Sequence, residues 1–266
     1  TCALPICGVV IVTTKKGKKG SGVNIQYRTL YGVAVKPKTR FEVMNASQFL
    51  TFQRDLLPGS QFGDGLSDVQ IAAIAGQTNT NWSDVFFQQG TTLSHELSIS
   101  TGSETTSSYT SAQYYKQEGI TLGSDLKRFS FRNNFNGSSE NKKFNYGTTL
   151  TLNYSVSNFI VDAARGGNTG GQLDNPFLVP YIGLPYLNRF NPDGSLNTFG
   201  TIRSGAINAN GDQVNANGFL NTPFLALNTA RFNTDQETEI KAVGSINADY
   251  NFAKNLTAGG SFGMDY

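Results

Sequence analysis

The feature that most limits how this chain can fold is a strict alternation of apolar and polar side chains. Residues 143–157 read KFNYGTTLTLNYSVS, with aromatic, aliphatic or Thr side chains at the even positions and polar residues or Gly at the odd ones. Successive side chains of a β-strand point to opposite faces, so the pattern predicts a strand with two chemically different faces. Strands of globular proteins usually run about five or six residues. The greater length here predicts a strand that keeps one apolar face and one polar face across the thickness of a hydrocarbon layer.

Six further stretches read as strands. Alternation is clear in 22–35, 93–100, 129–136, 240–252 and 256–264. Residues 105–120 also read as a strand, but the pattern does not decide which side chains share a face. The sequence therefore predicts seven strands.

The connections between these strands alternate between long and short. Tight turns are expected after the second, fourth and sixth strands, and longer connections at 36–91, 117–126 and 159–235. Outer-membrane barrels have short periplasmic turns and longer extracellular loops. We therefore expect the three longer connections to lie outside the cell.

Helix signals occur only in the first of these connections. Asn45 is a candidate N-cap for a helix over 46–57 that ends at Pro58-Gly59, and SDVQIAAIA and NWSDVFFQ read as shorter helical pieces, with Trp82 as a packing residue. Gly, Asn and Pro dominate 159–235, for which no regular structure is predicted. A structureless loop of that length is unusual in a compact domain unless it is functional.

Composition supports a barrel over a soluble sandwich. Charged residues make up 15% and the net charge is +2, against a usual charged fraction of about 25%. A soluble β-sandwich would carry more charge on its solvent face, and nothing in this balance points to nucleic acid. No apolar window of about 18 residues predicts a membrane-spanning helix. Because bacterial barrels have even strand numbers and no open edges, seven strands predict part of a larger transmembrane β-barrel.

The chain opens with TCALPIC, which contains both cysteines, Cys2 and Cys7. A disulfide or a short metal loop is the ordinary reading of such a pair. Thr-Cys-Ala-Leu-Pro-Ile is also what a common sequencing adapter encodes when it is translated. We interpret residues 1–7 as an artefact and leave them out of the fold. Lys15, Lys16, Lys18 and Lys19 then belong to a solvated basic connector.

Several segments together resemble TonB-dependent outer-membrane transporters, in particular their SusC/RagA-like branch. They fall in the order that this family shows, from the last plug strand into the early barrel. The segments are GVVIVTTKKGKKG and GVNIQYRTLYGV (8–33), MNASQFL (44–50), NWSDVFFQ (81–88), HELSISTGSETTSSYTSAQYYKQEGI (95–120), GSDLKRFSFRNNF (123–135) and NPF…YLNRFNPDGS (175–195).

The resemblance implies a plugged barrel of 22 strands in the outer membrane of a Gram-negative bacterium of the Bacteroidota. Residues 8–20 would be the last plug strand and its linker, and residues 21–266 the first part of the barrel, surrounded by outer-membrane lipids. The whole protein would import oligosaccharides or peptides. Its partners would be a TonB-type energy-coupling protein, which engages the N-terminal region, and a SusD-like lipoprotein that serves as a lid.

Nothing in the sequence points to an enzyme, a cofactor or a metal. The one histidine, His95, lies on the apolar phase of a strand, so a nucleophile would have no base elsewhere. Asp64, Asp68 and Asp84 lack the spacing of a calcium loop. The clusters GSGVN and GGNTGG do not lead from a strand into a helix, as phosphate loops do.

Recognition is the local function that the sequence supports. Aromatic faces beside planar polar side chains suit substrate or lid contacts, although the same residues could simply pack the loop on itself. The loop candidates are Phe177, Tyr181, Tyr186, Asn188, Arg189, Phe190 and Asp193. Arg128 and Arg132 are predicted to face the lumen, where they would contact a plug or line the path.

Two other classes of protein compete with a transporter. A structural or adhesive extracellular β-protein would also have long surface loops, but it would be soluble without a lipid-facing belt. A secreted glycan-acting enzyme is disfavoured, because no paired carboxylates occur in a recognisable context.

Overall fold

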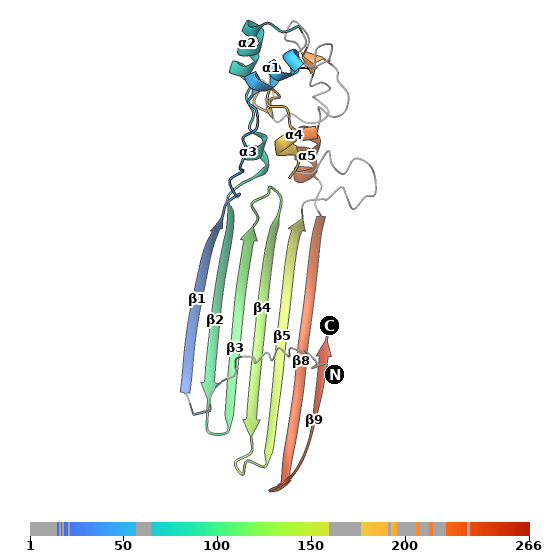
Figure 1. Ribbon diagram of the computed structural model, residues 1–266. Helices are drawn as coiled ribbons and strands as arrows, with labels where there is room; N and C mark the ends of the chain where they lie inside the picture. The colour runs from blue at the N-terminus through green and yellow to red at the C-terminus, as the bar shows by residue number, and fades with distance from the viewer. Residues whose placement is uncertain are drawn as a thin grey trace, which may run out of the picture.

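The computed structural model is one long antiparallel sheet with a group of small helices at one end (Figure 1). It describes residues 15, 17, 19–20, 22–56, 65–159, 177–190, 193–195, 206–207, 213–214, 222–232 and 235–266. The expected artefact at residues 1–7 and most of the expected plug segment at 8–20 lie outside these ranges. In the described part of the chain, no helix has the length and apolar character needed to cross a membrane.

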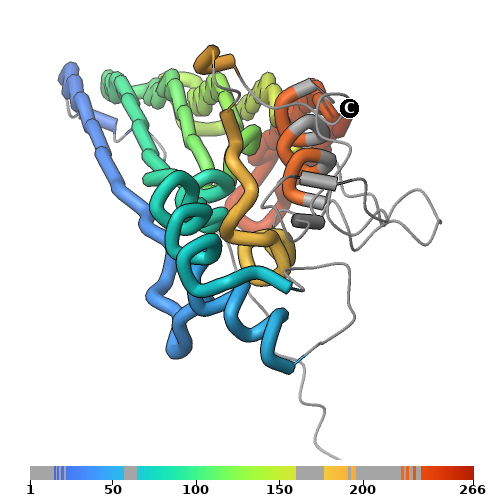
Figure 2. The backbone as a smooth tube through the Cα atoms, turned by 90° about the horizontal axis from the view of Figure 1, so that it is seen from above, coloured from blue at the N-terminus to red at the C-terminus, as the bar shows by residue number. Residues whose placement is uncertain are grey.

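All seven predicted strands are confirmed. They lie side by side in chain order, each antiparallel to the next, and along a curved wall when seen from above (Figure 2). Each has at least ten residues, which suits the 9–11 that a membrane-spanning strand needs. The strands are β1 (Gly22–Ala34), β2 (Gly90–Gly102), β3 (Thr106–Glu118), β4 (Asp125–Ser138), β5 (Phe144–Phe159), β8 (Asp235–Ala253) and β9 (Leu256–Asp265).

The register keeps one apolar face across the whole sheet. Tyr27 pairs with Leu97, which pairs with Ala112 on the next strand. Directly opposed residues share a face, so the apolar phases of all strands form a single outer surface. The register also assigns β3, which the sequence left undecided: Ala112 lies on the outer face, while Tyr109 and Gln113 lie on the polar inner face.

The helices form a cap at one end of the sheet, where the longer connections lie and which the sequence predicts to be extracellular. The three helices predicted in the first long connection are confirmed as α1 (Ala46–Leu56), α2 (Asp68–Gln77) and α3 (Trp82–Phe86). The expectation that 159–235 lacks regular structure is wrong. This connection contains two helices, α4 (Val179–Ile182) and α5 (Thr222–Phe232), and two short paired strands, β6 (Ala206–Ile207) and β7 (Gln213–Val214). The helix α5 is held by burial of Phe224 and Leu227 in the cap.

The main hydrophobic core lies in this cap, and its central residue is Trp82. The Trp82 side chain is 2% exposed and packs edge-on against Phe224, with 5.4 Å between ring centroids. Its indole Nε1 donates a hydrogen bond of 2.9 Å to the main-chain oxygen of Leu184. Gly183 lies against the same ring, where a Cβ would come within 2.7 Å of Trp82 Cδ1. The predicted packing role of Trp82 is confirmed, and it joins two connections that are far apart in the sequence.

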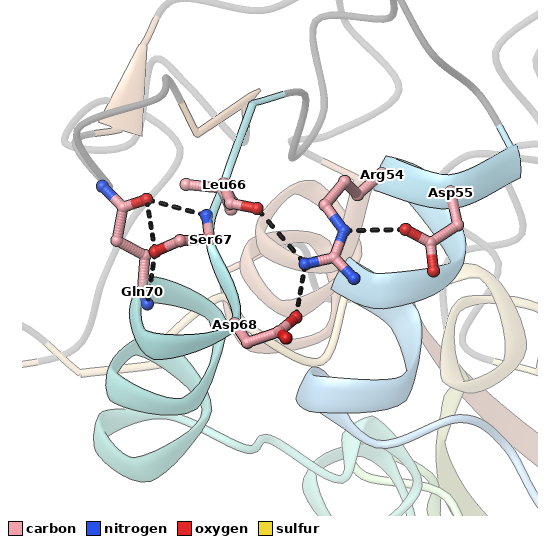
Figure 3. Close-up of polar contacts among 6 residues, drawn as sticks. All are labelled: Arg54, Asp55, Leu66, Ser67, Asp68 and Gln70. Carbon is pink, nitrogen blue, oxygen red and sulfur yellow. Dashed lines mark hydrogen bonds and ion pairs between the residues drawn. The ribbon is translucent and has the colours of Figure 1, made fainter.

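Polar contacts cap the start of α1 and link its last turn to the start of α2. Asn45 and Gln48 exchange side-chain-to-backbone hydrogen bonds of 2.9 and 3.0 Å, which confirms the predicted N-cap. Arg54 at the end of α1 donates to Asp55 at 2.7 Å and to Asp68 at the start of α2 at 2.6 Å (Figure 3). The Arg54 guanidinium lowers the pKa of the Asp55 carboxyl. One arginine therefore ties α1 to α2.

An arginine placed on the outer face should prevent assembly, whereas one on the inner face should be tolerated. Leu97→Arg puts a charge in the lipid-facing surface, at a cost of about 2–4 kcal/mol near the bilayer midplane. Gln113→Arg, at similar depth on the inner face opposite Glu96, is the matched control. We expect heat-modifiable, membrane-inserted protein to fall strongly only for Leu97→Arg. Equal yields would contradict the assignment of the two faces.

Removing the central ring should loosen the cap and leave the sheet intact. Trp82→Ala leaves a large cavity, and we expect the cap to lose about 3–5 kcal/mol. Hydrogen exchange should show reduced protection in α1, α3 and α5, with unchanged protection in β2–β5. Leu56→Ala, at a mostly exposed position of α1, is the control. Loss of protection throughout the sheet would show that the two parts fold as one unit.

Acid should weaken the contact between Arg54 and Asp55. Because the folded-state pKa of Asp55 is lowered, its contribution to stability is fully present above the unfolded-state pKa and is lost as pH falls through the folded-state value. Carboxyl titration by NMR should place the Asp55 pKa below its ordinary value, and Arg54→Gln should raise it back. A titration that is the same in both proteins would remove Arg54 as the cause.

Candidate functional site

The loop candidates from the sequence divide into buried, exposed and turn-forming residues. Tyr186 is 2% exposed and lies in the cap core, 6.2 Å from Phe49 between ring centroids, where burial raises the pKa of its phenol. Phe177, Tyr181 and Phe190 are exposed. Tyr186 therefore packs the loop, and the three exposed rings can still reach a ligand.

The polar candidates mainly shape the loop. Asn188 Oδ1 accepts a hydrogen bond of 3.0 Å from the Phe190 amide, and the Arg189 guanidinium lies 4.5 Å from the centre of the Phe190 ring. Asp193 accepts hydrogen bonds from the amide and hydroxyl of Ser195, which lower its carboxyl pKa. These contacts stabilise local turns around Phe190.

A hollow in the cap brings Tyr181 together with residues that the sequence did not single out. We call it the rim groove; it has a volume of about 450 Å³, and a second hollow of about 230 Å³ adjoins it at Val43, Pro180 and Tyr181. The rim groove is lined by Lys36, Thr39, Phe41, Glu42, Val43, Asn45, Gln48, Asn81, Ser83, Asp84, Pro180 and Tyr181. Sequence reasoning missed Phe41, and the one signal for it is an apolar pair, Phe41 and Val43, in a mostly polar connection.

The rim groove combines aromatic surface with amides and carboxylates. The rings of Phe41 and Tyr181 lie 5.5 Å apart at 50°, and both are exposed. Asn81 donates to Asp84 at 2.8 Å, which orients an amide and a carboxylate at the start of α3. Lys36 Nζ donates to the Ser83 hydroxyl and lies 5.1 Å from the centre of the Phe87 ring. Such a lining suits recognition of a sugar or a peptide.

A separate hollow, which we call the inner hollow, lies on the inner face of the sheet. It has a volume of about 520 Å³, and its lining includes Arg128 and Arg132 together with Glu96 and Tyr109. The Arg128 guanidinium lies 5.2 Å from the centre of the Tyr115 ring. The structure thus places both arginines on the predicted inner face, about four strand residues apart.

Residues of the basic connector lie against the same inner face. The Lys15 main-chain oxygen accepts a hydrogen bond of 2.6 Å from Asn134 Nδ2, and Lys19 Nζ donates to Ser138 at 2.8 Å. A Cβ at Gly17 would come within 2.5 Å of the Ser108 main-chain oxygen, so the two backbones are in close contact. Lys15 and Lys19 are exposed, as the sequence predicts, but the described residues of the connector are docked on the sheet.

The other polar residues considered from the sequence do not form a chemical site. His95 lies on the outer face, where its Nδ1 is 2.6 Å from the Tyr27 hydroxyl. Asp68 binds Arg54 and Asp84 binds Asn81, while Asp64 lies outside the described residues. Across the described ranges, no group of three or more His, Cys, Asp or Glu residues could hold a metal ion.

Comparison with known proteins gives one consistent answer. The chain is 27% identical to TonB-dependent receptor P3 of Formosa agariphila over 188 residues, which cover 71% of this chain and 17% of the relative. It is 24% identical to TonB-dependent receptor SusC of Bacteroides thetaiotaomicron, over 97% of this chain and 24% of the relative. No protein-family model matches the chain.

Solved structures show the same fold. The RagAB peptide importer in its open-open state matches 95% of this chain and 28% of the solved chain, with a TM-score of 0.65 and 21% identity. The closed-closed state matches the same share of this chain with a TM-score of 0.61 and 19% identity.

The sheet, its single apolar face and these relatives agree on the class: the chain is similar to part of the transmembrane β-barrel of TonB-dependent receptors. Within that class the chain is SusC/RagA-like, as the ordered sequence segments predicted. It spans about a quarter or less of the length of the two curated relatives described above.

Proposed function

We propose that this chain forms part of an outer-membrane importer that takes up oligosaccharides or peptides in a Gram-negative bacterium of the Bacteroidota. The importer would draw energy from a TonB-type protein and work with a SusD-like surface lipoprotein. The relative SusC and the RagAB peptide importer support this assignment by name, and the two organisms of the curated relatives support the lineage. All of these comparisons concern receptors or importers, which favours transport over enzymatic chemistry.

The observation that carries the proposal is the position of the rim groove. The paired rings of Phe41 and Tyr181 and the amides of Asn45 and Asn81 lie in the cap, at the extracellular end of a sheet whose inner face is polar. The inner face of the sheet has a separate hollow with polar side chains, including Arg128. The groove would then contact cargo or the lid before entry into the barrel.

The connector and the inner hollow fit a plugged barrel. Residues 8–20 would be the last plug strand and linker, and the contacts of Lys15, Gly17 and Lys19 with the inner face support a chain that enters the barrel there. Arg128 and Arg132 would then contact the plug or line the path beside it. In the described ranges, neither arginine forms an ion pair with a carboxylate.

The natural full-length protein provides the test. Phe41→Ala with Tyr181→Ala should lower affinity for its oligosaccharide or peptide cargo about tenfold or more, because stacking on an aromatic ring is worth roughly 0.5–1.5 kcal/mol beyond burial. Val69→Ala, which is 78% exposed on α2 and outside the groove, is the control. Binding is measured by calorimetry, and uptake by growth on that cargo.

Two results would contradict the proposal. Unchanged affinity in the double variant would remove the rim groove as a cargo site. A membrane-inserted full-length protein that neither binds nor imports an oligosaccharide or a peptide would favour a structural or adhesive protein instead.

A further inference from the structure

At its extracellular end, the outer face carries an aromatic row followed by two pairs of charged side chains. We call each of these three successive cross-strand sets a level. The deepest level is an aromatic row in which Tyr114, Phe129 and Tyr154 are directly opposed across β3, β4 and β5, each 42–50% exposed. Aromatic rows of this kind lie at the membrane–water interface of barrels. The row therefore marks the depth at which hydrocarbon gives way to lipid headgroups.

Charged residues occupy the next two levels. Lys116 and Lys127 face one another immediately beyond the aromatic row, and Glu118 and Asp125 face one another beyond the lysines. We call these the lysine level and the acidic level. Like charges that are directly opposed across a sheet are destabilising. Each level would gain from a ligand that supplies the opposite charge between its two members.

The contacts of these four residues leave part of the charge unmatched. Lys116 Nζ lies 2.7 Å from Glu118 Oε1, and the Thr91 hydroxyl donates to the other Glu118 oxygen at 3.2 Å. Lys127 makes no ion pair with any residue that the structure describes. Asp125 accepts one hydrogen bond, of 2.9 Å from Asn158, and its enclosed Oδ1 accepts none from the described residues. One cation therefore has no ion-pair partner, and one buried acceptor has no donor, among the described residues.

These residues enclose a hollow that can hold a headgroup. It has a volume of about 310 Å³ and is lined by Gln88, Lys116, Glu118, Gly123, Ser124, Asp125 and Lys127. The Ser124 hydroxyl donates to the main-chain oxygen of Thr121 at 2.8 Å and the Gln88 amide donates to that of Gly119 at 3.2 Å, so these two residues shape the wall of the hollow. The hollow opens where the outer face meets the connection between β3 and β4.

We propose that this hollow binds a zwitterionic phosphoethanolamine headgroup of an outer-leaflet lipid. In such a lipid the phosphate lies nearer the acyl chains and the ammonium lies farther out. The lysine level is likewise nearer the hydrocarbon, and the acidic level lies two strand residues, about 7 Å, farther out. The phosphate would contact Lys127 and Lys116, the ammonium would contact Asp125 and Glu118, and the acyl chains would follow the aromatic row.

The order of the two levels selects this headgroup over a simple anion. A headgroup with phosphate alone would satisfy the lysines but would place negative charge below Glu118 and Asp125. A choline headgroup carries both charges, but its trimethylammonium cannot donate hydrogen bonds to carboxylates. Phosphoethanolamine supplies both the charge order and the donors.

The test uses the natural full-length protein in detergent, with lipid binding measured by native mass spectrometry. The lipids are dipalmitoyl phosphatidylethanolamine, the matching phosphatidylcholine and phosphatidylglycerol, and lipid A with and without a phosphoethanolamine group. We expect phosphoethanolamine lipids to bind about tenfold or more tightly than the others, because one hydrogen bond to a charged group contributes about 1.5 kcal/mol or more. The two phosphoethanolamine lipids show whether a phospholipid or a glycolipid supplies the headgroup.

Three variants identify the residues involved. Lys116→Gln with Lys127→Gln should reduce phosphatidylethanolamine binding to the level of phosphatidylcholine. Asp125→Asn, which keeps its size, should remove the preference for ethanolamine over choline even if the double variant assembles poorly. Lys254→Gln, in the turn between β8 and β9, should change nothing. Equal binding of all lipids, tighter binding of phosphatidylglycerol, or a full preference in Asp125→Asn would overturn the proposal.

Discussion

The hydrogen-bonded register between neighbouring strands is the constraint on which the rest of this structure depends. Because side chains alternate with a period of two, a slip of one residue at any pairing would turn a whole strand's apolar set toward the polar face. In hydrocarbon, every backbone donor and acceptor of a spanning sheet also needs a partner within the sheet. The pairing of β5 with both neighbours keeps Leu152 and Tyr154 on one surface and Asn153 on the other. The polar inner wall of the sheet follows from this register.

The cap depends on a different kind of force. Its residues pack in three dimensions around Trp82 and Phe86, which are both almost fully buried. Thr80 adds hydrogen bonds to main-chain oxygens of Pro185 and Leu187, each 2.7 Å long. The packing of the end of α4 against the Trp82 ring places Tyr181 beside Phe41. The groove is thus a product of the cap core rather than of the strands.

These two forces explain what the sequence could and could not predict. The period of two is local, so residues 143–157 and the other strands could be read directly, and the N-cap at Asn45 was likewise a short-range signal. The core of the cap is not local. Nothing near Tyr186 distinguishes it from Tyr181, yet one is buried and the other exposed. Phe41 was missed because its partner is contributed by a distant connection, and α5 was missed because its burial, not a clear helical period, holds it in place.

The contact between Trp82 and Phe224 has a consequence for the order of assembly. The two rings are 142 residues apart in the chain, and β2, β3, β4 and β5 all lie between them. A loop that contains all four of those strands must close before the indole contacts its partner. Contacts between such distant residues form late because a long loop must close first. We therefore expect the cap to close after these strands have paired, and until then its apolar rings lack their packing partners.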